Sequence, residues 1–344
     1  MPDILIRKTA RAGHITLDRP EALNALTWEM CRAIDTALED WRSDPDIALV
    51  LIDAAGNRAF CAGGDIAEMY EAGQRGDFDY GAQFWADEYR LNLKLSRYDK
   101  PIVSFLHGFT MGGGVGIGCH GSHRIVCESS RIAMPECGIG LIPDVGGSLL
   151  LARAPGRLGL YLGLTGARMS PGDAIQCGFA DHFLPEDSWP ALKTTLSDTG
   201  DIAALQPETP PPSDLAKNQP QIDTLFEAST VELILDALDA AGTDLAEKTA
   251  AQIRRNSPLS MACALTLITR LTESSTLAEA LNWEYRFTSR AARYGDFLEG
   301  IRAAIIEKGS TPNWRHPIGG ISGDDLARML APVPNPPIAE GDIP

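Results

Sequence analysis

A glycine-rich stretch between two short apolar runs narrows the folds that are open to this chain. IVSFLHG, at 102–108, is a continuous apolar run of strand length, and HRIVCES, at 123–129, has the pattern of a second strand. Between them, TMGGGVGIGCHG supplies glycines, which let a helix start pack closely on its neighbours. This order of elements fits a layered α/β core. We therefore predict an α/β fold.

The rest of the chain predicts a core that is followed by a helical part. ILIRK and HITLD near the N-terminus alternate like strands, IALVLID is a buried-strand run, and residues 22–41 carry apolar side chains at helical spacing. Prolines dominate residues 206–220, which favours a linker or an exposed excursion there. We predict a core over 1–205, this linker over 206–220, a helical part packed on the core over 221–331, and a tail over 332–344.

The charge balance excludes two classes of partner. The 344 residues carry 30 Lys and Arg against 46 Asp and Glu, which gives a formal charge of −16. Nucleic acid and anionic membranes both bind through clustered cations, so we expect neither as a partner. No apolar run approaches the ~20 residues that a membrane helix needs. The first residues resemble neither a secretory signal nor a transit peptide, and a cytoplasmic location is therefore the default expectation.

Several common motifs are absent or weak in this sequence. There is no G-x-S-x-G elbow, and the seven cysteines include no C-x-x-C pair, which favours reduced core thiols. Residues 116–121 match the dinucleotide fingerprint G-x-G-x-x-G, but they lie far from the first strand, so we favour a closely packed helix start there. His120 and His123 lack a third zinc ligand at suitable spacing. We expect neither a cofactor nor a metal.

Two glycine-rich segments could supply paired hydrogen-bond donors. In CAGGDI, Gly63 and Gly64 would let backbone N–H groups approach a ligand with no side chain in the way. In HGFTMGGGVG, residues 112–114 precede an expected helix, whose first N–H groups have no intrahelical acceptor. Two such donors that converge on one oxygen would form an oxyanion hole.

A third segment, MPECGIGLIPDVGG, supplies two carboxyl groups in an apolar setting. Glu136 follows Pro135, and Asp144 follows Pro143. Neighbouring carboxyls in such a setting can differ in pKa, so that one stays ionised as a base or nucleophile while the other holds a proton. The alternative is structural: Asp144 would cap a helix that begins at Val145, and Glu136 would be a surface acid in a turn.

Together these segments resemble the crotonase (enoyl-CoA hydratase/isomerase) superfamily and, within it, a subgroup of acyl-CoA hydrolases. The resemblance covers most of the chain outside residues 206–220 and the tail. It implies a crotonase-like ββα spiral core with a helical C-terminal part. The segments that carry the resemblance are DRPEALNAL, FCAGGDI, ADEYRLN, IVSFLHGFTMGGGVGIG, AMPECGIGLIPDVGGSLLLAR, LTGARM and DFLEGIRAAIIEKGSTPNW.

The superfamily pattern also implies particular site residues. The N–H groups of Gly64 and Gly113 would hold the thioester oxygen, and Glu136 matches the glutamate of the second motif. Hydratases carry another catalytic glutamate after the glycine run, where this chain has Gly116. The resemblance therefore disfavours the addition of water to a double bond.

The hydrolase subgroup implies two further carboxylates. It pairs the glutamate of M-P-E with the aspartate of P-D-V-G-G, here Asp144, and the glutamate of its E-Y-x-L-N segment, here Glu88, lies near the acyl group. The implied reaction is hydrolysis of an acyl-CoA thioester, with 3-hydroxyisobutyryl-CoA, a compound of valine breakdown, as the expected substrate. Glu136 would act as general base or as nucleophile, with Asp144 orienting the water or stabilising the departing thiol, and Glu88 would bind the 3-hydroxyl.

Two other readings stay open at this point. One is an enoyl-CoA hydratase or isomerase, and the other is a relative that binds acyl-CoA or RNA without catalysis. The preferred acyl group also stays open, because small 3-hydroxyacyl groups differ by single methyls. Superfamily members commonly form trimers or pairs of trimers, but the longer C-terminal part leaves the oligomeric state open, with a homo-oligomer as one expectation.

Overall fold

The computed structural model describes residues 3–339, and the chain forms two compact units, which are taken in turn below. Residues 134–167 group with the C-terminal helices in the second unit, although the sequence places them in the core. The predicted boundaries at 205 and 221 follow composition and stay a prediction. The first unit comprises the chain up to Asp65, Arg90–Ala133 and Arg168–Asp214, and the second comprises Ile66–Tyr89, Met134–Ala167 and the chain from Leu215 onward.

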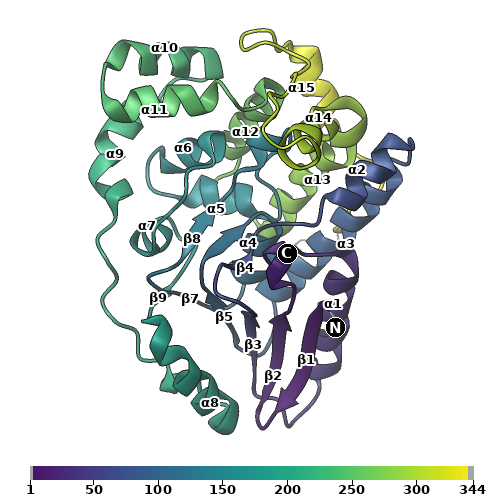
Figure 1. The fold of residues 1–344 in the computed structure, drawn as a ribbon, viewed down its shortest axis with the longest axis vertical. Coiled ribbons are helices and arrows are strands. Elements are labelled where there is room, and N and C mark those ends of the chain that lie inside the picture. Colours follow the sequence, from purple (N-terminus) through teal and green to yellow (C-terminus); the bar gives the residue numbers. More distant parts are fainter. Residues whose placement is uncertain (1–2, 340–344) are drawn as a thin grey trace. The chain divides into compact units, whose positions relative to one another are not determined.

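The first unit is built on a six-stranded sheet with the spatial order β1-β2-β3-β5-β7-β9 (Figure 1). β1 pairs antiparallel with β2, and every later pair in this sheet is parallel. The apolar runs of the sequence become its central strands. The six strands are β1 (Ile4–Thr9), β2 (Ala12–Leu17), β3 (Leu49–Ala54), β5 (Ile102–Leu106), β7 (His123–Val126) and β9 (His182–Phe183).

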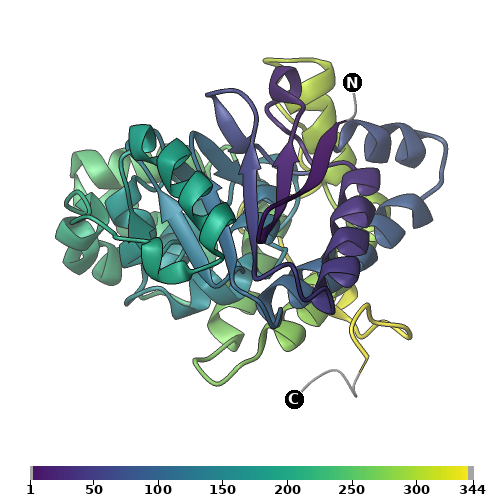
Figure 2. The ribbon, with the colours of Figure 1, turned by 90° about the horizontal axis from the view of Figure 1, so that it is seen from below.

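Helices cover both faces of this sheet. Side chains of one face pack with Leu196 of α8 (Trp189–Thr199). On the other face, Trp41 of α1 (Trp28–Arg42) lies so close to Gly13 that a Cβ would not fit there. Figure 2 shows α1 and α8 on opposite sides of the strands. Burial on two faces explains why β3 has a continuous apolar sequence instead of an alternating one.

A second, three-stranded parallel sheet of the first unit leads into the glycine-rich helix. Its spatial order is β4-β6-β8, and α4 (Gly113–Gly118) begins two residues after β6 ends. The remaining elements of this unit are short. The three strands are β4 (Ala59–Cys61), β6 (Phe109–Met111) and β8 (Arg131–Ala133). The short elements are η1 (Pro20–Ala22), α7 (Pro171–Gln176), η3 (Glu186–Ser188) and η4 (Ile202–Ala204).

The second unit is helical throughout its described elements. α12 and α13 lie at its centre and contact several other helices, and α10 and α11 form an antiparallel pair (Figure 1). Two helices, α3 (Asp79–Ser96) and α9 (Asp214–Leu225), contain a boundary between the units. The others are α2 (Ala67–Gln74), η2 (Glu136–Ile139), α5 (Gly147–Arg153), α6 (Leu158–Thr165), α10 (Val231–Ala241), α11 (Asp244–Ile253), α12 (Pro258–Arg270), α13 (Leu277–Tyr294), α14 (Phe297–Ile301), the π-helical turn η5 (Arg302–Ile306) and α15 (Gly323–Leu330).

The structure differs from the sequence-based expectation in two places. α9 begins at Asp214, inside the proposed linker, and continues through Pro220. The expected tail is partly docked: Asn282 exchanges two hydrogen bonds with the backbone of Ile338, whose side chain is buried. A proline removes only its own N–H, and an apolar residue among prolines can still bury its side chain. Residues 340–344 of that tail lie outside the described part.

Two other sequence-based expectations can be compared with the structure. All seven cysteines are buried and none is in a disulfide, as expected of core thiols. Among residues 3–339, no helix is both long enough and apolar enough to span a membrane.

A buried charge network joins β2, β3 and α8 in the first unit. Asp53, 8% exposed, accepts hydrogen bonds from Thr16 Oγ1 at 2.6 Å and Lys193 Nζ at 2.7 Å and lies 3.0 Å from His14 Nε2. Burial alone would raise the pKa of Asp53, but the hydrogen bond to His14 and the charge of Lys193 outweigh it and hold that pKa well below its usual range.

We predict that Asp53→Asn lowers the free energy of unfolding by about 2 kcal/mol, because it leaves the half-buried ammonium of Lys193 without its counter-charge. The folded-state pKa of Asp53 is depressed, so this contribution is present above the ordinary carboxyl pKa and is lost as the pH falls. Urea unfolding at neutral and acidic pH measures the difference. Asp239→Asn, in the exposed pair with Arg254, is the matched control and should change little. Equal effects of the two variants would contradict the prediction.

Candidate active site

Gly64 lies in the first unit, just after β4, with its N–H directed away from Leu26. Leu26 N–H donates to the Gly63 carbonyl at 2.9 Å, and Asp65 N–H donates to the Leu26 carbonyl at 2.8 Å. The Gly63 carbonyl and the Gly64 N–H belong to one trans peptide group and point in opposite directions, so the N–H of Gly64 points away from Leu26. Apart from Gly64 itself and its two chain neighbours, no heavy atom of the described residues lies within 4 Å of a Cβ built at Gly64.

The start of α4 lies beside this segment. Gly113 is the first residue of α4, so its N–H has no intrahelical acceptor. Its neighbour Gly114 packs against the carbonyl of Cys61, three residues before Gly64. A Cβ at position 114 would collide with that carbonyl. Gly118 likewise packs on Phe60, which agrees with a closely packed helix start at this glycine run. The two donor segments are therefore adjacent, while their convergence on one oxygen stays a prediction.

Glu136 and Asp144 are buried in the second unit, at 4% and 3% exposure. Glu136 begins the turn η2, whose Cys137 carbonyl accepts a hydrogen bond from Ser257 N–H at 2.9 Å. The N-cap of α5 is Gly146, and no side chain caps that helix. Asp144 therefore does not cap α5, and Glu136 is no surface acid, which removes the structural alternative for both.

Glu88 of α3 is a third buried carboxyl of the second unit, at 3% exposure. Oε1 of Glu88 and Oε2 of Glu136 have no hydrogen-bond partner among the described residues. A buried carboxyl oxygen without a partner is costly, and such atoms in native proteins call for an explanation, such as a catalytic role. The three carboxyls predicted from the sequence thus lie in one unit, and two of them have an acceptor oxygen without a partner among the described residues.

Burial raises the pKa of all three carboxyls, and the charge of Asp144 raises that of the two glutamates further. Burial, followed by the nearby charge of Asp144, raises the pKa of Glu88 well above its ordinary value. The same two causes raise the pKa of Glu136. Burial raises the pKa of Asp144 to about 7, against the lowering effect of a hydrogen bond from Tyr89. Because the pKa of both groups is raised, Glu136 and Asp144 together can hold one proton and one negative charge near neutral pH.

Tyr89 was not singled out from the sequence. Its hydroxyl donates to Asp144 Oδ2 at 2.7 Å and lies 3.3 Å from Thr288 Oγ1 of α13. Burial, the charges of Asp144 and Glu284 and this bond raise the pKa of Tyr89 well above its ordinary value, so the phenol stays protonated and can donate. The only sequence signal for it is its place in the E-Y-x-L-N segment.

Glu284 of α13 is a fourth buried carboxyl, which the sequence motifs did not identify. It is 0% exposed and accepts hydrogen bonds from Gly146 N–H at 2.8 Å and Ser148 N–H at 3.1 Å. Burial raises the pKa of Glu284 to about 8, in opposition to the bonds that it accepts. Its sequence signal is a charged residue among apolar ones on the buried face of the helix, beside Leu281 and Phe287.

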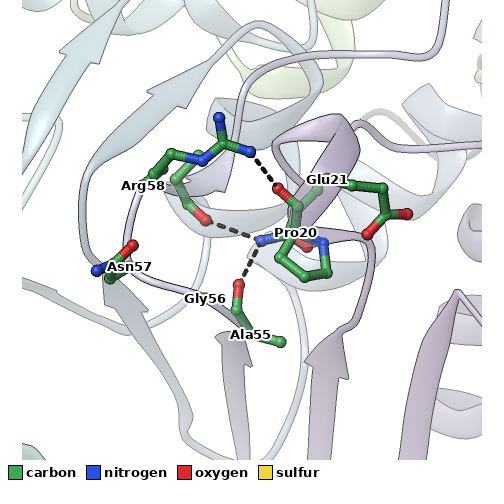
Figure 3. Close-up of a pocket in the computed structure, with 8 residues that line it drawn as sticks. Pro20, Glu21, Ala55, Gly56, Asn57 and Arg58 are labelled. Atoms are coloured by element: carbon green, nitrogen blue, oxygen red, sulfur yellow. Dashed lines mark hydrogen bonds between the residues drawn. The ribbon is translucent and has the colours of Figure 1, made fainter.

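One other candidate ligand site holds none of these residues. Figure 3 shows a cavity of about 210 Å³ in the first unit, where Arg58 donates to the Pro20 carbonyl at 2.8 Å. Its lining includes none of the predicted site residues. Within the described chain, no group of three or more His, Cys, Asp or Glu is arranged to hold a metal ion, and Cys119, beside the H-x-x-H pair, is buried.

The sequence matches a family model described as enoyl-CoA hydratase/isomerase over residues 12–329. Among curated proteins, it is 40% identical to the mitochondrial 3-hydroxyisobutyryl-CoA hydrolase of Danio rerio, over 91% of this chain and 85% of that protein. It is 38% identical to the protein of the same name from Homo sapiens, over 91% of this chain and 84% of that one.

Solved structures show the same architecture. A Rhodobacter sphaeroides structure described as an enoyl-CoA hydratase is 55% identical and superposes with a TM-score of 0.94, covering 96% of this chain and 98% of that one. A Mycobacterium thermoresistibile structure described as a carnitinyl-CoA dehydratase is 39% identical, with a TM-score of 0.94, over 99% and 100%. The expected α/β fold, a crotonase core with a helical C-terminal part, is confirmed.

We predict that Gly64→Ala and Gly114→Ala differ in stability. A methyl group at Gly64 meets open space, whereas one at Gly114 would collide with the backbone of Cys61. Thermal unfolding should therefore leave Gly64→Ala within about 0.5 kcal/mol of the wild type, and it should place Gly114→Ala lower by about 1–3 kcal/mol. A large loss for Gly64→Ala, or none for Gly114→Ala, would contradict this packing.

Proposed function

Because this chain belongs to the enoyl-CoA hydratase/isomerase family, we propose that it is an acyl-CoA thioester hydrolase that converts 3-hydroxyisobutyryl-CoA and water to 3-hydroxyisobutyrate and CoA. The observation that carries the proposal is the burial of Glu136 near the charge of Asp144, with its pKa raised and its Oε2 left without a partner among the described residues. The curated relatives that bear the hydrolase name match this chain over nine tenths of its length, which supports the same reaction.

In the proposed reaction, the N–H groups of Gly64 and Gly113 hold the thioester oxygen as it gains negative charge. The ionised member of the pair Glu136 and Asp144 removes a proton from water as the water oxygen attacks the carbonyl carbon. Alternatively, Glu136 attacks that carbon itself and forms a mixed anhydride as the thiolate leaves, and water then hydrolyses the anhydride to the free acid and regenerates Glu136. In both routes the carbon–sulfur bond breaks, and the protonated member of the pair supplies the proton that the departing thiolate takes up. A pair that holds one proton and one charge supplies both halves of this reaction.

Glu88 is proposed to select the acyl group. Its Oε1 has no partner among the described residues, and the pKa of this buried carboxyl is raised, first by burial and then by Asp144. A 3-hydroxyl would supply the missing hydrogen bond. A substrate without that hydroxyl would leave the group unpaired, which is the kind of contact that discriminates strongly between substrates.

A second candidate function is hydration of a 2-enoyl-CoA. The observation in its favour is the similarity, at 55% identity, to the Rhodobacter sphaeroides structure that is described as an enoyl-CoA hydratase. Against it, the position where hydratases are expected to carry their second glutamate is Gly116, a buried glycine inside α4. Loss of 2-enoyl-CoA absorbance without thiol release would favour the hydratase over the hydrolase.

The remaining partner and location assignments stay predictions. We propose an acyl-CoA as the small-molecule partner, with no nucleic acid or membrane, and a homo-oligomer as one expected state. The cytoplasmic location is also a prediction, and the curated relatives are named as mitochondrial proteins.

We predict that Glu136→Gln abolishes thiol release from 3-hydroxyisobutyryl-CoA. The amide can neither take a proton from water nor attack the thioester, so kcat should fall by about 10³-fold or more. Thiol release is followed with a chromogenic disulfide, across 3-hydroxyisobutyryl-, 3-hydroxypropionyl- and isobutyryl-CoA.

The matched control is Glu247→Gln, which alters an exposed carboxyl of α11 and should keep wild-type turnover. Wild-type turnover by folded Glu136→Gln would overturn the assignment of Glu136. No turnover of any 3-hydroxyacyl-CoA by the wild type would overturn the proposed function itself.

We predict that Tyr89→Phe moves the rising limb of the pH profile of kcat/KM to higher pH. The Tyr89 hydroxyl stabilises ionised Asp144, so its loss raises the pKa of the pair, by about 1 pH unit for one hydrogen bond. Tyr285→Phe is the control: it removes a nearby hydroxyl that donates to the Ala82 carbonyl, and the limb should stay in place. A shift to lower pH, or equal shifts in both variants, would contradict the prediction.

A further inference from the structure

Glu284 holds the chain immediately after Asp144. Its Oε2 accepts the N–H of Gly146 at 2.8 Å, and its Oε1 accepts both the N–H of Ser148 at 3.1 Å and the Ser148 hydroxyl. All three donors lie within four residues of Asp144. The carboxyl is fully buried, on the central helix α13 of the second unit.

The turn that Glu284 holds has a strained backbone. Val145 has a φ of 52°, in the left-handed region that β-branched residues rarely adopt, and Gly146 follows at a φ of 79°. Such conformations persist only where the surrounding structure enforces them, and they gather at functional sites. The Gly147 N–H donates to the Asp144 carbonyl at 2.7 Å and closes the turn. The direction of the Asp144 side chain therefore depends on contacts that keep Val145 in this conformation.

α13 also reaches Asp144 by a second route. Thr288 lies one helical turn after Glu284, with its Oγ1 3.3 Å from the Tyr89 hydroxyl, which donates to Asp144 Oδ2. Residues four apart on a helix share one face. One face of α13 thus contacts both the backbone that follows Asp144 and the tyrosine that binds its carboxylate.

We propose that Glu284 is a positioning residue for the reaction: it clamps the strained turn 145–148 and so aims the carboxylate of Asp144. The proposal rests on the proposed hydrolase function. A carboxyl group suits this task because it presents two oxygens that can accept, and three donors point at them. An amide in its place would face one backbone N–H with an NH₂ group and would lose that bond.

The test compares Glu284→Gln with the wild type in steady-state thioester hydrolysis. The substituted side chain has the same size, so the fold should persist, while the turn loses part of its clamp. A misplaced catalytic group costs up to about 10²-fold in turnover, so we expect kcat to fall by at least about 10-fold, with KM within about threefold. Ser148→Ala removes only one of the three donors and should lower kcat less.

Asp173→Asn is the matched control for loss of a buried, clamping carboxyl. Asp173 is 6% exposed and accepts the Ser170 N–H at 3.1 Å, the Ser170 hydroxyl at 2.7 Å and the Ser213 hydroxyl at 2.6 Å, at the start of α7. It belongs to the first unit and not to the proposed machinery. This variant should lose thermal stability and keep the wild-type kcat and KM.

Amide hydrogen exchange gives a readout that needs no activity. In Glu284→Gln, the amides of Gly146 and Ser148 should exchange faster than in the wild type. In Asp173→Asn, their exchange rates should equal those of the wild type. Unchanged exchange in Glu284→Gln would overturn the clamp, even if the wild type hydrolysed no thioester and the proposed function failed. Faster exchange with wild-type kcat would overturn the positioning role, as would equal falls in kcat for Glu284→Gln and Asp173→Asn.

Discussion

Glu88, Glu136, Asp144 and Glu284 are all buried in one unit, and burial raises the pKa of each. The charge of Asp144 raises the pKa of the three glutamates further, and no cation is among the causes. Four charges at such a site would be too costly, so protons must be retained at neutral pH. The local hydrogen bonds decide where the remaining negative charge lies. Tyr89 favours it on Asp144, and the N–H groups of Gly146 and Ser148 favour it on Glu284.

Much of the fold follows from local patterns in the sequence. The apolar run at 47–52 and the run at 102–106 became β3 and β5 because a parallel sheet covered on both faces requires apolar side chains on both. The start of α9 at Asp214 could not be predicted from a segment so rich in proline. The docking of Ile338 depends on Asn282, 56 residues away, and local patterns hold no information about such a contact.

The residues of the candidate site also divide into those that the sequence identifies and those that only the structure reveals. Glu136 and Asp144 could be identified because they stand in one short segment among glycine and apolar residues. Glu284 could not, because its three donors lie 136–138 residues earlier in the chain and because one glutamate on an apolar helix face has several structural explanations. Glu88 was reached only through the family resemblance, and its burial and free oxygen are properties that the structure adds.

The long separation between Glu284 and the turn that it holds also affects how the protein matures during translation. The ribosome synthesises Asp144 well before α13, and 138 residues separate Gly146 from Glu284. Until α13 has been made and has left the exit tunnel, the Val145 turn lacks its anchor and Tyr89 lacks its neighbour Thr288. A nascent chain that ends before α13 therefore has an unfinished carboxyl cluster, and the complete geometry appears only near the end of synthesis.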